Sequence, residues 1–107
     1  MNSPDLLTRR LAVEIFDAVL RRNKGLEDEY SFCMERQEQN RPLENRDRTF
    51  VRLLVTVMLR RLGQIDDIIG HFLKKPLPDK ACYVQDILRI GTAQLVFLDT
   101  PAHAAVS

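Results

Sequence analysis

The sequence lacks most of the features that mark β-rich, membrane-spanning, secreted or metal-binding proteins. It has no tryptophan, 7% aromatic residues and four glycines, a composition that fits a helical protein better than a β-sandwich. No stretch approaches the roughly 18 apolar residues of a membrane span, and the first ten residues have no signal-peptide core. Cys33 and Cys82 stand apart, without a CxxC motif or a histidine pair, so we expect two reduced thiols. These absences predict a soluble, cytoplasmic protein.

Catalytic motifs are missing as well. The four glycines lie far apart, so the sequence contains neither a P-loop nor a GxGxxG turn. Asp66 and Asp67 are adjacent, but neighbours on a helix point about 100° apart and cannot share a proton, so we expect solvated helix surface or a favourable charge at a helix N-terminus. His71 and His103 have no second ligand at metal spacing, and we expect structural roles, with His103 packed at a corner between helices. The chain is therefore expected to be no enzyme and to hold no metal or cofactor.

What the sequence does contain is a helical hydrophobic pattern. Apolar residues recur at intervals of three and four, and no useful stretch alternates with a period of two. This pattern predicts an all-α protein of one domain with a modest core. We expect helices at about residues 4–22, 26–39, 46–62, 64–73 and 81–98. Ser3 is the expected N-cap of the first helix and Gly25 the residue that ends it.

The stretch from Asp86 onward is the most apolar part of the chain. Residues 86–98 leave only a narrow polar strip, and such a helix is normally buried among others. Gly91 in its middle costs about 1 kcal/mol relative to alanine, which suggests the close approach of a second backbone. Thr100 and Pro101 predict the N-cap and first residue of a sixth helix. Because the chain stops about two turns later, we expect it to be a fragment.

Two groups of arginines lie near the starts of predicted helices, where the helix dipole favours anions. Arg9 and Arg10 lie in the second turn of the first helix, and Arg46, Arg48 and Arg52 lie near the start of the third. Arginines at helix C-termini are explained by the dipole, but these are not. We predict that the five bind RNA phosphates. The net charge of only +1 permits a basic face, because acids gather in the second predicted helix. A GC-rich genome would also raise the arginine content.

Three segments, in this order and at these spacings, resemble the NusB-like helical domain. They are TRRLAVEIFDAVLRR, NRDRTFVRLLVTVMLRRLGQID and ILRIGTAQLVFLDTPAHAAV. In this family the domain occurs alone as an antitermination factor and also as the N-terminal part of 16S rRNA (cytosine-C5) methyltransferases. The ending PAHAAV resembles the methyltransferase branch. The chain departs from that branch at Thr100, where a proline is usual, and at Thr92 and Ala93, where an aromatic residue often follows the glycine.

The resemblance implies an all-α NusB-like domain of two small helical bundles over residues 1–107, truncated before its last helices. It implies a parent enzyme that transfers a methyl group from S-adenosylmethionine to cytosine C5 in 16S rRNA. The catalytic cysteines of such enzymes lie in a separate C-terminal domain and are not Cys33 and Cys82. The implied partners are 16S rRNA and the enzyme's own catalytic domain, with no membrane. Self-association is expected if the missing helices leave residues 87–98 partly uncovered.

Two other interpretations remain open at this point. A NusB-type antitermination scaffold would bind a short RNA together with a ribosomal protein. A purely structural domain would pack against its own catalytic domain and touch no RNA. The arginines distinguish the last interpretation from the first two, because only RNA binding requires them.

Overall fold

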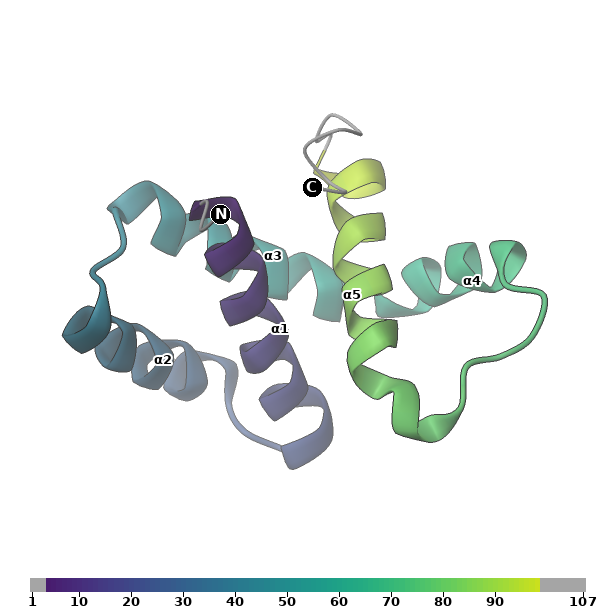
Figure 1. Cartoon of the computed structure of the whole chain (residues 1–107), viewed down its shortest axis with the longest axis horizontal. Coiled ribbons are helices and arrows are strands. Elements are labelled where there is room, and N and C mark those ends of the chain that lie inside the picture. The colour runs from purple at the N-terminus through teal and green to yellow at the C-terminus, as the bar shows by residue number, and fades with distance from the viewer. Residues whose placement is uncertain (1–3, 99–107) are drawn as a thin grey trace. The chain divides into compact units, whose positions relative to one another are not determined.

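Helices account for most of residues 4–98, the part of the chain that the computed structural model describes (Figure 1). No strand occurs within this range, so the predicted all-α class is confirmed. The elements are α1 (Pro4–Arg22), α2 (Leu26–Asn40), α3 (Asn45–Arg60), α4 (Leu62–Phe72), the 3-10 turn η1 (Asp79–Ala81), α5 (Cys82–Thr92) and the π-helical segment η2 (Ala93–Phe97). The chain divides into two compact units, Met1–Thr56 and Val57–Ser107. That residues 1–107 form one domain stays a prediction.

The first unit contains α1, α2 and most of α3, and α1 packs against α2. Its buried side chains recur at helical spacing on each element, as the apolar pattern requires. The largest of them, Phe16, is completely buried. The other buried apolar residues are Leu11, Ala12, Val13, Ile15, Ala18, Cys33, Met34, Val51, Leu54 and Val55.

The end of α1 differs from the prediction. Asn23, with φ of 55°, adopts the left-handed conformation, which asparagine tolerates because its short polar side chain can hydrogen-bond locally. The backbone N–H of Lys24 then donates to the carbonyl of Ala18 at 3.1 Å. Gly25 has φ of −74° and is the N-cap residue of α2, so its predicted role as the residue ending α1 is wrong. The expected cap Ser3 lies outside the described residues.

The second unit pairs α4 with α5. Met58, Ile65, Ile69 and Ile90 are buried here. The helix α4 begins at Leu62, so Gly63 lies inside it and does not separate it from α3. Irregular backbone follows α4 as far as residue 78, and this confirms the loop predicted from its two prolines.

One side of α5 is buried and the other is exposed. Asp86, Arg89 and Ile90 are buried, whereas Ile87 is 42% exposed. Other exposed apolar residues on α5 and η2 are Tyr83, Val84, Leu88, Leu95 and Val96. The expectation of a helix buried on most sides is therefore wrong.

Gly91 does not mark a close helix contact. A Cβ placed on this residue has no neighbour within 4 Å among the described residues, so the predicted approach of a second backbone is wrong. The helix widens after Thr92 into the π-turn η2, in which the N–H of Leu98 donates to the carbonyl of Ala93 at 3.1 Å. The predicted sixth helix, at Thr100, lies outside the described residues. Between residues 4 and 98, no helix is long and apolar enough to cross a membrane.

Candidate nucleic-acid interface

All of the arginines predicted to bind RNA lie in the first unit, on α1 and α3. Arg10 is exposed on α1. Its neighbour Arg9 is 8% exposed and takes part in contacts within the chain. The adjacent positions therefore serve different purposes, since neighbours on a helix point in different directions. Arg10 can reach an external ligand, whereas Arg9 belongs to the packing of α1.

The arginines of α3 pair with acids of α2. Arg52 donates from Nε to Oε1 of Glu27 at 3.0 Å and from Nη2 to both carboxylate oxygens at 2.7 and 2.8 Å. The Nη2 of Arg48 donates to Oε2 of Glu38 at 3.1 Å. Nearby, the hydroxyl of Tyr30 donates to the carbonyl of Arg48 at 3.0 Å and ties the two helices together. Helix α2 thus supplies the anions that the sequence pattern assigned to an outside ligand.

Arg46 is the most exposed of the three α3 arginines predicted to bind RNA. Its side chain is 80% exposed, and its nearest carboxylate oxygens belong to Glu44, at 3.5 Å, and Asp47, at 3.9 Å. These distances leave the guanidinium without a short hydrogen bond to either acid. Arg46 therefore retains donors for another anion.

The exposure of each arginine–carboxylate pair determines whether a phosphate can replace the carboxylate. Arg52 and Glu27 are 51% and 68% exposed, and an exposed ion pair contributes only about 0–1 kcal/mol. A phosphate can replace the carboxylate of Glu27 at little cost, because the guanidinium fork binds both groups in the same way. Arg48 is more enclosed: its side chain is 34% exposed, and its Nε is buried with no hydrogen-bond partner in the described part of the chain. Arg10, Arg46 and Arg52 are thus the most available members of the predicted set.

A pocket of about 240 Å³ in the same unit is lined by residues of α1 and α2, including Glu14, Asp17 and Glu29. Glu14 pairs with Arg36 at 2.7 Å, and the Arg36 guanidinium lies 5.7 Å from the centre of the Phe32 ring. Burial raises the pKa of the Cys33 thiol in this pocket, and the negative charge of Glu14 raises it further. The acids make this pocket unsuited to phosphate.

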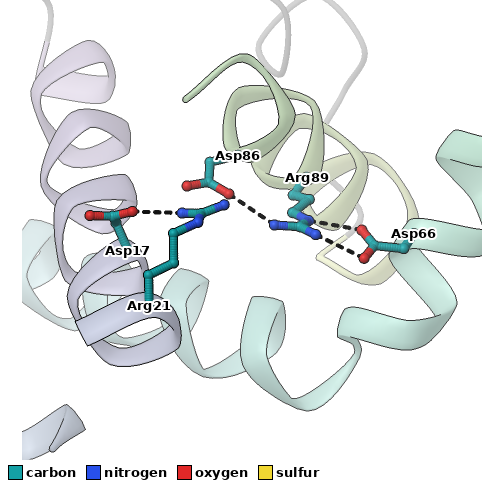
Figure 2. Close-up of polar contacts among 5 residues, drawn as sticks. All are labelled: Asp17, Arg21, Asp66, Asp86 and Arg89. Carbon is teal, nitrogen blue, oxygen red and sulfur yellow. Dashed lines mark hydrogen bonds and ion pairs between the residues drawn. The ribbon is translucent and has the colours of Figure 1, made fainter. Parts of the chain in front are cut away.

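Sequence reasoning missed an ion cluster in the second unit, which joins α4 to α5 (Figure 2). Arg89 donates from Nε and Nη2 to the two carboxylate oxygens of Asp66 at 2.8 and 2.9 Å, and from Nη1 to Asp86 at 3.0 Å. Arg89 is 9% exposed, Asp86 1% and Asp66 36%. Hydrogen bonding to Asp66 raises the pKa of the guanidinium above its already high value. The cluster is a fixed structural link, with its charges directed at one another.

Two predictions change because of this cluster. Asp66 was expected to be solvated surface, but it binds Arg89, while Asp67 is exposed as predicted. Arg89 is one of the polar residues in the narrow strip expected along residues 86–98, and it is buried. Asp66 and Arg89 both lie in segments that carry the family resemblance. That shared membership is the sequence signal from which their contact could have been predicted. Figure 2 also shows the surface pair of Arg21 and Asp17, 2.6 Å apart on consecutive turns of α1.

Within residues 4–98, the remaining candidate groups form no site. Cys33 and Cys82 are free thiols. No group of three potential metal ligands occurs among the residues that the structure describes. His71 lies exposed in the last turn of α4, and His103 lies outside the described residues.

Comparison with known proteins places the chain in a family. The NusB family matches residues 7–107. The chain is 31% identical over 100 residues to the ribosomal RNA small subunit methyltransferase B of Xanthomonas campestris pv. campestris, covering 94% of the chain and 22% of that protein. It is 29% identical over 99 residues to the protein of the same name from Photorhabdus laumondii subsp. laumondii (92% and 22%), and 31% identical over 101 residues to that from Pasteurella multocida (94% and 21%). It thus spans about a fifth of these relatives' length. No solved structure matches.

Proposed function

Because the chain belongs to the NusB family, we propose that it is the RNA-binding domain of an S-adenosylmethionine-dependent 16S rRNA (cytosine-C5) methyltransferase. The observation that carries the proposal is the match to relatives named ribosomal RNA small subunit methyltransferase B over about a fifth of their length. In this proposal the chain docks rRNA, while methyl transfer and the binding of S-adenosylmethionine belong to the catalytic part of a longer, cytoplasmic protein. The ending PAHAAV, which resembles the methyltransferase branch, supports the same assignment.

The docking contacts that we propose are phosphate contacts on the first unit. Arg10 and Arg46 offer exposed guanidinium groups, and Arg52 becomes available when a phosphate replaces Glu27. Arg9 and Arg48, the other predicted contacts, are more enclosed, and we assign them to holding α1 and α3 in position. Contacts of this kind fix the position of an RNA without reading its sequence. Sequence-specific chemistry would then depend on the catalytic part.

The test is the salt dependence of RNA affinity for the double variant Arg10→Ala/Arg46→Ala. Fluorescence anisotropy with labelled single-stranded segments of 16S rRNA should show weaker binding of every segment. The slope of log affinity against log salt should fall by about 1.4, because each phosphate contact to a single strand contributes about 0.7. A matched control is Arg22→Ala/Lys24→Ala, which removes the same charge at the C-terminal end of α1.

Two results would contradict the proposal. A wild-type chain with no measurable affinity for RNA would indicate a purely structural domain. A double variant with the slope and affinity of its control would remove the assigned contacts. The antitermination alternative requires a ribosomal-protein partner, so a stable complex of the chain with such a protein would favour it over the methyltransferase.

A further inference from the structure

A second candidate site lies wholly within the second unit, beside the loop that connects α4 to η1. A pocket of about 250 Å³ opens here, slightly below the range of roughly 300–1,000 Å³ that holds drug-sized ligands. Its apolar lining comes from Ile69, Leu73, Pro76 and Leu77. The size and lining fit one flat heterocyclic ring.

Two polar side chains complete the lining, Asp66 from α4 and Gln85 from α5. The carboxylate of Asp66 already accepts two hydrogen bonds from Arg89. An ionised carboxylate has about four acceptor positions, so Asp66 retains capacity to accept from a ligand N–H. Arg89 also compensates its charge. Apolar walls with a few fixed polar groups are the usual composition of a site for a small ring ligand.

The charges next to the pocket favour a polyanion. Lys74 and Lys75 lie on the loop between the lining residues Leu73 and Pro76, and both are exposed. Neither has an ion-pair partner in the part of the chain that the structure describes. Phe72, just before them, is 82% exposed. Basic residues beside an exposed aromatic ring are the elements with which proteins hold the backbone and stack the bases of single-stranded nucleic acid.

The pocket of the first unit provides the contrast. Glu14, Asp17 and Glu29 line it, together with arginines of which Arg36 is already paired with Glu14. Its acids repel phosphate. The pocket beside the loop has a single acid, which accepts two hydrogen bonds from Arg89, and two unpaired lysines beside it. Of the two pockets, only this one matches a nucleotide.

We propose that this pocket binds one base of a single-stranded RNA, with the flanking phosphates on Lys74 and Lys75 and a neighbouring base on Phe72. The inference rests on the proposed RNA-binding function, but it assigns a site on the second unit, separate from the arginines of the first. The acceptor on Asp66 can take a hydrogen bond from an exocyclic amino group of a base or from the ring N–H of uracil. One hydrogen bond of this kind corresponds to about two- to tenfold in affinity.

Gly70 offers a variant that blocks the pocket without disturbing the fold. It lines the pocket, and a Cβ at this position has no neighbour within 4 Å in the described structure. Leucine is also a better helix former than glycine, so Gly70→Leu should strengthen α4 while its side chain occupies the pocket. Gly63→Leu is the matched control, because Gly63 lies on the same helix with the same free space and does not line the pocket.

The experiment compares the wild-type chain with both variants for binding labelled oligocytidine and oligouridine of twelve nucleotides, by fluorescence anisotropy. Gly70→Leu should lose about fivefold or more in affinity for both oligonucleotides, the lower limit for one stacked base. Gly63→Leu should match the wild type. Thermal unfolding followed by circular dichroism verifies that both variants are folded.

The possible failures are distinguishable. If the wild type binds oligonucleotides and Gly70→Leu binds as tightly as Gly63→Leu, the base pocket is overturned and the proposed function stands. If Gly70→Leu leaves RNA affinity intact but weakens a complex with a protein, the surface is a protein-docking site and the inference is again overturned. If the wild type binds no RNA at all, the proposed function fails and the inference fails with it.

Discussion

In the first unit, the pair of Arg52 and Glu27 lies in solvent, with the two side chains 51% and 68% exposed. In the second unit, Arg89 and Asp86 are 9% and 1% exposed, and Arg89 also binds Asp66. The bonded distances of these three pairs are nearly the same, between 2.7 and 3.0 Å. Geometry therefore does not separate the two kinds of pair. The difference between them is burial. Solvent and salt screen the attraction between the charges of an exposed pair, whereas the charges of a buried pair are screened much less.

This difference assigns different roles to the same chemistry. Removing one partner from a buried pair leaves a charge without water or a counter-ion, which is costly even where the intact pair contributes little. An exposed arginine that loses its acid is simply hydrated and can bind another anion. We therefore regard the buried cluster as part of the fold and the exposed pairs as a reserve of phosphate contacts.

The largest expected effect is on stability and comes from Arg89→Met. The variant removes the hydrogen bonds that Arg89 donates to Asp66 and to the buried Asp86, and it should lower the free energy of unfolding by about 3–5 kcal/mol. The matched change Arg52→Met should cost about 0–1 kcal/mol. Urea denaturation followed by circular dichroism measures both, and a chain with Arg89→Met that is already unfolded in buffer also meets the prediction. If both variants lose the same free energy of unfolding, the proposed difference between the buried and the exposed pairs is wrong.

A smaller effect concerns pH and the core of the first unit. Burial raises the pKa of Cys33 in the folded chain. Above about pH 8.5 the thiol of the unfolded chain therefore ionises first, and stability that is complete below this pH is lost as the pH rises towards the folded pKa. The loss is at most about 1.4 kcal/mol per pH unit. Unfolding in urea at pH 7.5 and pH 10 should show this decline in the wild type. Cys33→Val should show a smaller decline, and identical declines would rule out the thiol as its source.

Local structure was largely predictable from the sequence. The apolar spacing located each helix to within a few residues, because a face that must be buried imposes its period on the sequence. The wrong predictions concern a helix end and the burial of a helix, which local sequence patterns do not determine. Asn23 took the left-handed position expected for Gly25, since both residue types tolerate it. Residues 86–98 were apolar enough for complete burial, yet Ile87 and Val96 remain exposed, because composition does not say which neighbours are present.

The candidate site was less predictable. The arginines were identified as unusual from their place on each helix, but their partners Glu27 and Glu38 lie 25 and 10 residues away along the chain. Dipole arguments treat each helix alone and cannot reveal a contact between helices. The buried cluster was missed for the same reason, because Asp66 and Arg89 are 23 residues apart. Pairing of this kind is a property of tertiary packing.

The most direct test of the role assigned to the first unit is the RNA affinity of Glu27→Gln, measured by fluorescence anisotropy at low salt. This change releases Arg52, so affinity for single-stranded 16S rRNA segments should rise by up to about fivefold, which corresponds to the contribution of one exposed pair. Glu35→Gln, which removes an exposed charge from the same helix, is the control for net charge, and Arg52→Ala should weaken binding. If Glu27→Gln binds RNA no more tightly than Glu35→Gln, Arg52 is not a phosphate contact and its pair with Glu27 is only part of the fold.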